Sequence, residues 1–392
     1  MEAEIDVKDG SGKTPLFHAA MERRLDAVEY LLAMGANPEV LDDSNRSPLH
    51  YVAGRGHTDV IPLLLSKGIN VDVIADMGSP LQYAATASKP DTVKVLLDHG
   101  ANPNLVFHDT FTPLQASIGS QSWQCAEKLL KAGADPNLGG DGVKALIVAA
   151  EVGAIEIIKD EAGAAPNVTK TVRGTTQIIK LLVEAGADPN VTNIHGLKPI
   201  EIVATIGNHR GVEILFPVTS PVPSYVDWSV NGIMKHANSK EFENKMIRQI
   251  KESFLVAKSR GTSAFQRKDY WLALYWYTEA LDMKARDAAV LSNRSLCYVY
   301  LKNGDLAFED ATQCILERPD WPKAHYRAGV ALKMLKRLDE AASTFSSGLK
   351  LDPKNKELED ALSSAPGMAL KANSNFQHLD LECALKLRSY EE

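Results

Sequence analysis

The small and apolar residues of the first half of the chain recur every 32 or 33 residues. Thr-Pro or Ser-Pro begins at residues 14, 47, 79 and 112, and degenerate copies begin at residues 144 and 198. Each copy leads into a short Ala-rich run, a second apolar run and a turn such as Gly35-Ala36-Asn37-Pro38. Thr or Ser can cap the first helix, Pro suits its opening turn, and Gly ends the second helix. The pattern predicts six pairs of short helices over residues 1–216.

No single helix pair can bury its apolar side, so the pairs must stack into a solenoid. The repeated Thr/Ser-Pro, Ala-rich and Gly-Ala-Asn/Asp-Pro segments resemble the ankyrin repeat, in six recognisable copies. His18 and His50 are interpreted as the usual histidines of this repeat. The resemblance implies a structural role for both, in which the imidazole bridges backbone groups.

The fifth copy is longer than the others, because 54 residues separate Lys144 from Lys198. Joining Lys159 directly to Leu181 restores an intact second helix and turn. We therefore predict an insertion at residues 160–180, inside the outer helix of the fifth repeat. Residues 6–10 resemble the end of an earlier repeat, so we expect a truncated or alternatively started form of a longer ankyrin array.

A Pro-rich stretch follows the last copy, at residues 216–223. Its composition predicts a stiff, extended connector rather than a packed segment. A helical pattern then begins near Met234. We therefore assign residues 217–244 to a linker with a lead-in helix.

Residues 245–362 follow a different period, of 34 residues. Two registers hold small residues and a third holds Pro: Ala273, Ala307 and Ala341; Gly261, Ser295 and Gly329; Pro319 and Pro353. Small residues let two antiparallel helices cross closely, and Pro ends the second helix.

This pattern resembles three tetratricopeptide repeats (TPRs), at residues 254–287, 288–321 and 322–355, with a capping helix near residues 356–362. The predicted fold class is therefore all-α, with an ankyrin-repeat solenoid followed by a three-repeat TPR α-solenoid. Residues 363–392 read as a polar, poorly ordered tail.

The resemblance to the TPR domains of chaperone co-factors implies a peptide-binding groove. In that family, a carboxylate clamp of two Lys, two Asn and one Arg grips the C-terminal Glu-Glu-Val-Asp of the 70-kDa and 90-kDa heat-shock proteins. The pattern falls on Lys258, Thr262, Asn293, Lys323 and Arg327. Four residue types match, while Thr262 stands where the family has Asn. A hydroxyl can still donate one hydrogen bond, but it reaches less far.

The charge distribution fits such a ligand. The net charge of −7 and the lack of a long Lys/Arg run argue against a general nucleic-acid binder. Residues 1–244 hold 20 Lys/Arg and 30 Asp/Glu, whereas residues 245–362 hold 20 and 16, which favours an acidic partner for the second half. The start of the chain lacks an apolar signal segment, and no apolar run approaches the ~18–20 residues that span a bilayer. We expect no membrane insertion and a cytoplasmic, or nuclear, location.

No motif indicates an enzyme, a metal site or a cofactor. Residues 10–14, Gly-Ser-Gly-Lys-Thr, end like a phosphate-binding loop, but Val7 stands where the loop needs another Gly. The four Cys are isolated, which predicts buried or idle thiols. The aromatic residues at 270–277 have helical spacing, which favours packing between repeats over base stacking.

Two functions are compatible with this architecture, which resembles ankyrin–TPR proteins of plants. The leading hypothesis is a protein-interaction adaptor or co-chaperone, whose ankyrin face binds an unidentified client while its TPR groove binds a heat-shock protein. The alternative is a regulatory or targeting subunit of a signalling enzyme such as a phosphatase, with a non-chaperone ligand in the groove.

Overall fold

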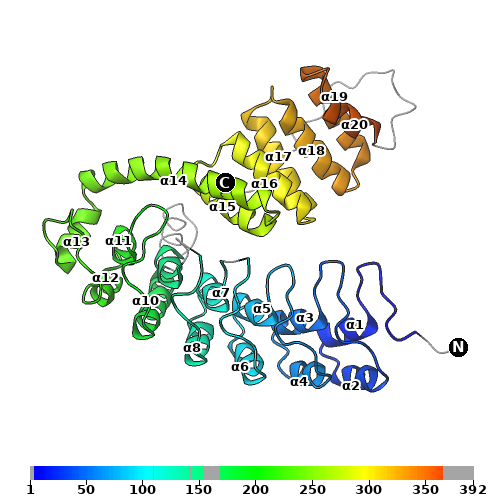
Figure 1. Ribbon diagram of the computed structural model, residues 1–392, viewed down its shortest axis with the longest axis horizontal. Helices are drawn as coiled ribbons and strands as arrows, with labels where there is room; N and C mark the ends of the chain where they lie inside the picture. Colours follow the sequence, from blue (N-terminus) through cyan, green and yellow to red (C-terminus); the bar gives the residue numbers. More distant parts are fainter. Residues whose placement is uncertain (1–3, 109, 141–143, 153–167, 365–392) are drawn as a thin grey trace. The chain divides into compact units, whose positions relative to one another are not determined.

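The computed structural model describes residues 4–108, 110–140, 144–152 and 168–364 (Figure 1). Within these residues the regular elements are helices, and β-structure is limited to two isolated bridges, Ala75–Gly78 and Phe107–Phe111. The all-α prediction is confirmed. The chain divides into two compact units, Met1–Ser253 and Phe254–Glu392, which we describe separately.

The described part of the first unit contains six helix pairs, as the repeats predicted (Figure 1). Inner helices α1, α3, α5 and α7 contact one another in succession, as do outer helices α6, α8, α10 and α12. The inner elements are α1 (Pro15–Met21), α3 (Pro48–Arg55), α5 (Pro80–Thr86), α7 (Pro113–Gly119), the helical residues 145–152 and α11 (Pro199–Thr205). The outer elements are α2 (Leu25–Ala33), α4 (Val60–Leu65), α6 (Pro90–Asp98), α8 (Trp123–Lys131), α10 (Val168–Glu184) and α12 (His209–Leu215).

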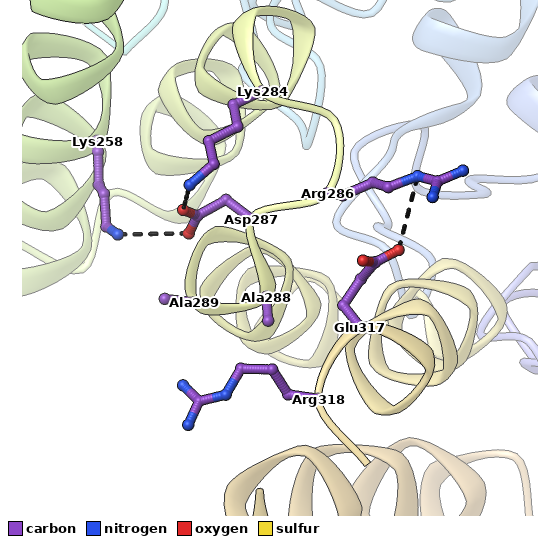
Figure 2. Close-up of a pocket in the computed structure, with 8 residues that line it drawn as sticks. All are labelled: Lys258, Lys284, Arg286, Asp287, Ala288, Ala289, Glu317 and Arg318. Atoms are coloured by element: carbon purple, nitrogen blue, oxygen red, sulfur yellow. Dashed lines mark hydrogen bonds and ion pairs between the residues drawn. The ribbon is translucent and has the colours of Figure 1, made fainter. Parts of the chain in front are cut away.

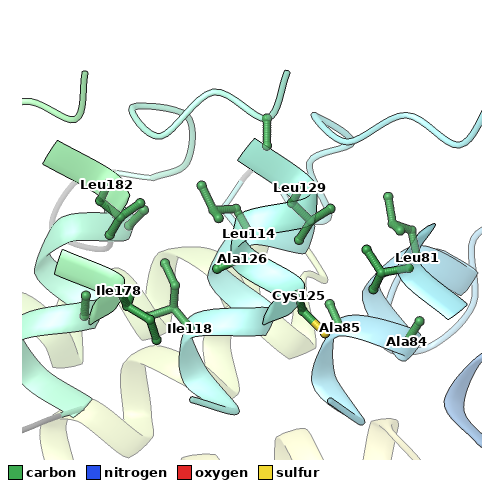
Figure 3. Close-up of a cluster of buried hydrophobic side chains, with 14 of the residues drawn as sticks. Leu81, Ala84, Ala85, Leu114, Ile118, Cys125, Ala126, Leu129, Ile178 and Leu182 are labelled. Atoms are coloured by element: carbon green, nitrogen blue, oxygen red, sulfur yellow. The ribbon is translucent and has the colours of Figure 1, made fainter. Parts of the chain in front are cut away.

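The core of this unit alternates large aliphatic residues with alanine (Figure 3). Leu81, Leu114 and Leu129 are fully buried or nearly so, and Ala85 and Ala126 lie among them at 0% exposure. Alanine lets neighbouring helices approach closely, and the leucines fill the space between the pairs. Each pair therefore depends on the next one for its burial.

The predicted caps open the inner helices, but only one of the two histidines bridges backbone groups. His50 accepts from the Ser47 amide at Nδ1 (3.1 Å), and its Nε2 lies 3.0 Å from the carbonyl oxygen of Val73 in the next turn. His18 instead lies 2.8 Å from a carboxylate oxygen of Asp9 and is half exposed. The prediction for His18 was wrong because His18 stands one residue further from its cap than His50 does, where the helix turns it outward.

A ladder of asparagine side chains joins successive turns. Asn104 accepts from the Asp135 amide (2.7 Å) and donates to the Gly133 carbonyl (2.9 Å). Asn137 makes the same two bonds, at 2.7 and 2.9 Å, to the amide of Asp188 and the carbonyl of Gly186. The first rung joins Asn104 to a residue 31 positions away and the second joins Asn137 to one 51 positions away. The geometry of the rung is therefore preserved across the long fifth repeat.

The structure shifts the register of the predicted insertion. Residues 160–167 lie outside the described residues, whereas residues 168–180 belong to α10, which has 17 residues against 9 in α8. Ile178 and Ile179 are buried and belong to this outer helix, whereas residues 157–159 lie outside the described residues. The sequence could not decide this, because Ile-Ile-Lys occurs at both 157–159 and 178–180. Removing residues 160–180 or 157–177 gives the same chain.

The predicted linker is instead packed onto the end of the ankyrin stack. Tyr225 and Ile233 are 7% and 0% exposed and belong to the apolar core of the first unit. The hydroxyl of Tyr225 donates to Glu201 (3.2 Å), and α13 (Val230–Ala237) contacts α11 and α12. Residues 217–244 thus cover the last repeat. Their proline content suggested an extended connector, but the apolar residues between the prolines find partners on the stack.

The second unit contains the helices expected for three TPRs and a capping helix (Figure 1). A Cβ atom on Gly329 would lie 2.3 Å from the ring of Phe345, and one on Gly261 would lie 2.7 Å from the ring of Tyr277. The 34-residue registers therefore mark true helix crossings. The elements are the last part of α14 (Lys240–Gln266), α15 (Tyr270–Met283), α16 (Ala288–Tyr300), α17 (Gly304–Glu317), α18 (Pro322–Met334), α19 (Leu338–Leu351) and α20 (Lys356–Ser363). The unit boundary falls inside α14, and the predicted tail lies outside the described residues from residue 365 on.

Deletion of residues 160–180 should raise the melting temperature of the first unit. The shortened chain keeps an Ile-Ile-Lys triplet in the outer helix and restores the usual repeat length, and contacts between neighbours set the stability of a solenoid. Differential scanning calorimetry of the full chain and of the deletion variant measures the effect. A lower midpoint for the deletion would mean that the removed residues stabilise the stack.

A candidate peptide-binding groove

The five predicted site residues lie on the first helices of the three TPRs. Lys258 and Thr262 are one turn apart on α14, Asn293 lies on α16, and Lys323 and Arg327 are one turn apart on α18. Helices α16 and α18 contact each other directly. Each helix is positioned by its own second helix, which packs behind it at the small-residue crossings.

A buried tyrosine joins two of the predicted residues. The Thr262 hydroxyl donates to the carbonyl of Lys258 (3.0 Å) and lies 3.3 Å from the hydroxyl of Tyr277. Burial raises the pKa of Tyr277, and hydrogen bonds with Thr262 and Asn293 act in the opposite direction. Tyr277 is 2% exposed and therefore fixes both side chains from beneath the groove. The sequence showed Tyr277 only as a packing residue; the available signal was its hydroxyl, which Phe345 lacks at the equivalent position.

Lys323 and Arg327 form a pair of like charges. Burial lowers the pKa of both, and the nearby guanidinium of Arg327 lowers the pKa of Lys323 further. The charged groups lie near aromatic rings: Lys323 Nζ is 5.8 Å from the ring centre of Trp321, and Arg327 Cζ is 5.6 Å from that of Tyr326. The negative charge of Glu357 raises the pKa of both groups in part, but within the described residues neither side chain forms an ion pair, and the buried Nε of Arg327 has no hydrogen-bond partner. This geometry is suited to an anion.

Lys258, in contrast, already has a partner. Its ammonium lies 3.4 Å from Oδ1 of Asp287, whose Oδ2 lies 2.9 Å from the ammonium of Lys284 (Figure 2). Burial would raise the pKa of Asp287, but the hydrogen bond from Lys284, the Val290 amide and the charge of Lys258 lower it overall. Asp287 is therefore a carboxylate that the site holds in advance of any ligand.

Asp287 lies beside a shallow hollow of about 260 Å³, in which cations outnumber acids (Figure 2). Arg318 is one of the lining residues, and its guanidinium lies 4.7 Å from the ring of Trp321. The lining residues are Lys258, Lys284, Arg286, Asp287, Ala288, Ala289, Glu317 and Arg318. The hollow extends the positive character of the groove beyond the five predicted residues.

A buried ion pair fixes α16, which carries Asn293. Arg294 forms two hydrogen bonds with the carboxylate of Asp310 on α17, at 2.7 and 2.8 Å, and a third with Thr278 on α15 at 3.3 Å. Burial lowers the pKa of Arg294. The hydrogen bonds with Asp310 and its negative charge raise this pKa by more, so the pKa of the guanidinium is raised overall. Because both charges are mostly buried, loss of one partner would leave the other unpaired. The pair holds the three helices in one arrangement.

Other chemistry is limited in the described part of the chain. Cys125, Cys297 and Cys314 are buried, and burial raises the pKa of Cys297 to about 12 and that of Cys314 to about 11. Among the described residues, no group of three or more His, Cys, Asp and Glu side chains is placed to hold a metal ion. None of the helices described here combines the length and apolar character needed to cross a membrane.

Two family models match this chain. A model of ankyrin repeats, in three copies, matches residues 1–75, 34–107 and 81–170. A model described as the TPR repeats of serine/threonine-protein kinase BSK1-like proteins matches residues 233–328. The chain carries ankyrin repeats followed by a TPR region. These repeat domains indicate that its partners are proteins, and they support a role as a protein-interaction adaptor.

Curated relatives match the chain over part of their length. The heat shock protein sti1 homolog of Schizosaccharomyces pombe is 39% identical over 117 residues, which is 30% of this chain and 20% of the relative. An Hsp70-Hsp90 organising protein of Plasmodium falciparum is 34% identical over 145 residues, 36% of this chain and 58% of the relative. The chain thus covers between about a fifth and three fifths of these two proteins.

Solved structures resemble each part separately. The ankyrin repeat domain of Bcl-3 is 23% identical with a TM-score of 0.45, covering 54% of this chain and 86% of the other. The Arabidopsis OM64 TPR domain is 31% identical with a TM-score of 0.29, covering 29% of this chain and 95% of the other.

Replacing Arg327 by Met should stabilise the ligand-free TPR unit. Met keeps much of the side-chain volume and removes a partly buried charge that has no ion-pair partner in the described structure. We expect a gain of about 1 kcal/mol, together with loss of anion binding. Chemical denaturation of the full chain, followed through the second unit's transition, measures the change. A clear loss of stability would show that the guanidinium supports the fold rather than a ligand.

Proposed function

We propose that this protein is a co-chaperone adaptor. Its TPR groove binds the C-terminal Glu-Glu-Val-Asp peptide of 70-kDa and 90-kDa heat-shock proteins, and its ankyrin repeats bind a client protein. We place this activity in the cytoplasm or the nucleus.

The observation that carries the proposal is the unpaired cation pair Lys323 and Arg327. A fold gains little from holding two positive groups close together when one of them, Arg327, is partly buried and neither has an ion-pair partner among the described residues. A ligand that ends in two carboxylates, the α-carboxylate and an Asp side chain, would offset both charges. Lys258 and Asn293 would hold the α-carboxylate, and Lys323 the Asp side chain. Arg327 would bond the peptide nearby.

The similarity to relatives supports the same assignment. Two of them are named as Hsp70-Hsp90 organising proteins or heat-shock proteins, and their matches cover 117 and 145 residues of sequence. The lengths of these matches are those of a three-repeat TPR unit rather than of a whole organising protein. The proposal therefore concerns the groove, and the client of the ankyrin repeats is a separate question.

A peptide that ends in free Glu-Glu-Val-Asp should bind the full chain, and amidation of its terminus should nearly abolish binding. Charge-assisted hydrogen bonds contribute ~1.5–3 kcal/mol each, so Lys323→Ala or Arg327→Ala should weaken binding roughly tenfold or more. Added salt should weaken it as well. Isothermal titration calorimetry measures all three effects.

Lys333→Ala is the matched control for these two variants. Lys333 lies on the same helix, α18, but its ammonium bonds the hydroxyl of Ser364 (3.0 Å) and has no predicted ligand role. Its replacement should change the affinity less than about twofold. The proposed chaperone ligand would be refuted if the free and amidated peptides bound equally well, or if neither Lys323→Ala nor Arg327→Ala changed the affinity.

Thr262→Asn should tighten binding of the same peptide. Thr262 uses its hydroxyl on the Lys258 carbonyl and near Tyr277, whereas Asn projects a donor further from the helix. One additional hydrogen bond to the carboxylate would strengthen binding roughly threefold to tenfold. Thr262→Val is the control, because it keeps the shape and removes the hydroxyl. If Asn binds no better than Thr, position 262 does not face the ligand.

A second candidate function is a regulatory or targeting subunit of a signalling enzyme. The observation that favours it is the family model at residues 233–328, whose description names serine/threonine-protein kinase BSK1-like proteins. The groove would then bind a non-chaperone peptide. Affinity purification of the full chain and of an Arg327→Ala variant separates the candidates, because only the chaperone adaptor loses heat-shock proteins selectively.

A further inference from the structure

The starting observation is that an acid of the protein itself occupies one of the groove's lysines. Asp287 Oδ1 lies 3.4 Å from Lys258 Nζ, although the two residues lie 29 positions apart on different helices. The side chain of Lys258 is 33% exposed and that of Asp287 is 13% exposed. The contact therefore lies at the edge of the groove, where solvent screens it only in part.

Asp287 is firmly held without Lys258. Its Oδ1 accepts the amide of Val290 (3.1 Å), so the residue caps the N-terminus of α16. Its other oxygen accepts from Lys284 (2.9 Å), and Figure 2 shows the carboxylate between the two ammonium groups. The carboxylate can therefore stay in place when Lys258 turns away from it.

A ligand carboxylate and Asp287 require the same cation. Both are acceptors of charge-assisted hydrogen bonds, and a second carboxylate close to the first is repelled by it. Lys258 also has a flexible four-carbon stem, so it can exchange one acceptor for the other without movement of the backbone.

We propose that Asp287 sets the affinity of the groove by competing with the ligand's carboxylate for Lys258, and that Lys284 retains Asp287 when Lys258 is released. Asp287 thus lowers the affinity of the groove for its peptide, and Lys284 limits that effect. This inference rests on the proposed function, because it takes Lys258 as a ligand contact. It adds two residues, Asp287 and Lys284, that the clamp pattern does not contain.

The test is the affinity of Asp287→Asn for the free Glu-Glu-Val-Asp peptide, measured by titration calorimetry on the full chain. Asn is as good an N-cap as Asp, so the start of α16 is kept while the charge is removed. We expect binding about threefold to tenfold tighter than in the unchanged protein, because Lys258 no longer pairs with a carboxylate of the protein and the repulsion between the two carboxylates is gone. A thermal melt checks the fold; should Asp287→Asn be unstable, Asp287→Ser keeps a capping hydroxyl and gives the same reading.

Asp269→Asn is the matched control. Asp269 caps α15 through the amide of Leu272 (3.1 Å), so the substitution makes the same change of charge and keeps the same kind of cap. Its effect on affinity should be below about twofold, because it lies at the start of the second helix, away from Lys258. An equal gain from Asp269→Asn would mean that net charge alone explains the tightening, and the proposal would be wrong.

A double-mutant cycle tests the role of Lys284. Lys284→Ala alone should weaken binding, because Asp287 then depends on Lys258 as its remaining cation. In the Asp287→Asn background, Lys284→Ala should change the affinity less than about twofold. If Lys284 acts only as a nearby positive charge, it will weaken binding equally in both backgrounds.

The outcomes separate this inference from the proposed function. If neither the unchanged protein nor Asp287→Asn binds the peptide, the chaperone ligand and this inference both fail. If the unchanged protein binds and Asp287→Asn binds equally or more weakly, the proposed function stands and the competition by Asp287 is refuted. Tighter binding by Asp287→Asn, with Asp269→Asn silent, supports both.

Discussion

Burial between neighbouring helix pairs is the constraint on which the rest of the structure depends. The inner helices of the first unit have seven or eight residues where their bounds are defined, too few to be stable alone. They persist because buried Ala residues let adjacent pairs share one apolar core. The second unit has the same constraint: a methyl added at Gly329 would lie 2.3 Å from Phe345, so the spacing of α18 and α19 leaves no room for a larger residue there. The repeat period in the sequence reflects the need for small residues wherever neighbouring helices pack together.

The same stacking produces the groove. When three similar pairs stack, their first helices present equivalent faces side by side, and residues far apart in sequence come to share one surface. The helices are held together by the small-residue crossings behind the groove and by the Arg294–Asp310 ion pair. Residues on the open face are then free to carry charges that the fold does not require, as Lys323 and Arg327 do. A cation without a partner is tolerated here because its neighbours keep the helix in place.

The sequence predicted those features that recur and missed those that occur once. The helix pairs and their caps followed from the 33- and 34-residue registers, and the five groove residues followed from the resemblance to the TPR domains of chaperone co-factors. The roles of Tyr277 and Asp287 did not follow, because each depends on one polar atom reaching another helix. The packing of residues 217–244 was missed for a related reason. Proline content describes the local chain, whereas Tyr225 and Ile233 are positioned by a surface that only the folded stack provides.

The asparagine ladder has a consequence for how such a chain can change over evolution. A rung is made by one short asparagine side chain and the backbone of the next turn. The rung of Asn104, which joins residues 31 positions apart, and that of Asn137, which joins residues 51 positions apart, have the same lengths. Register along the array is thus set at the turns and is independent of the length of chain between them. New segments can therefore enter between two rungs without shifting the repeats on either side. One repeat can therefore lengthen within its outer helix while the turns keep the neighbouring repeats in register.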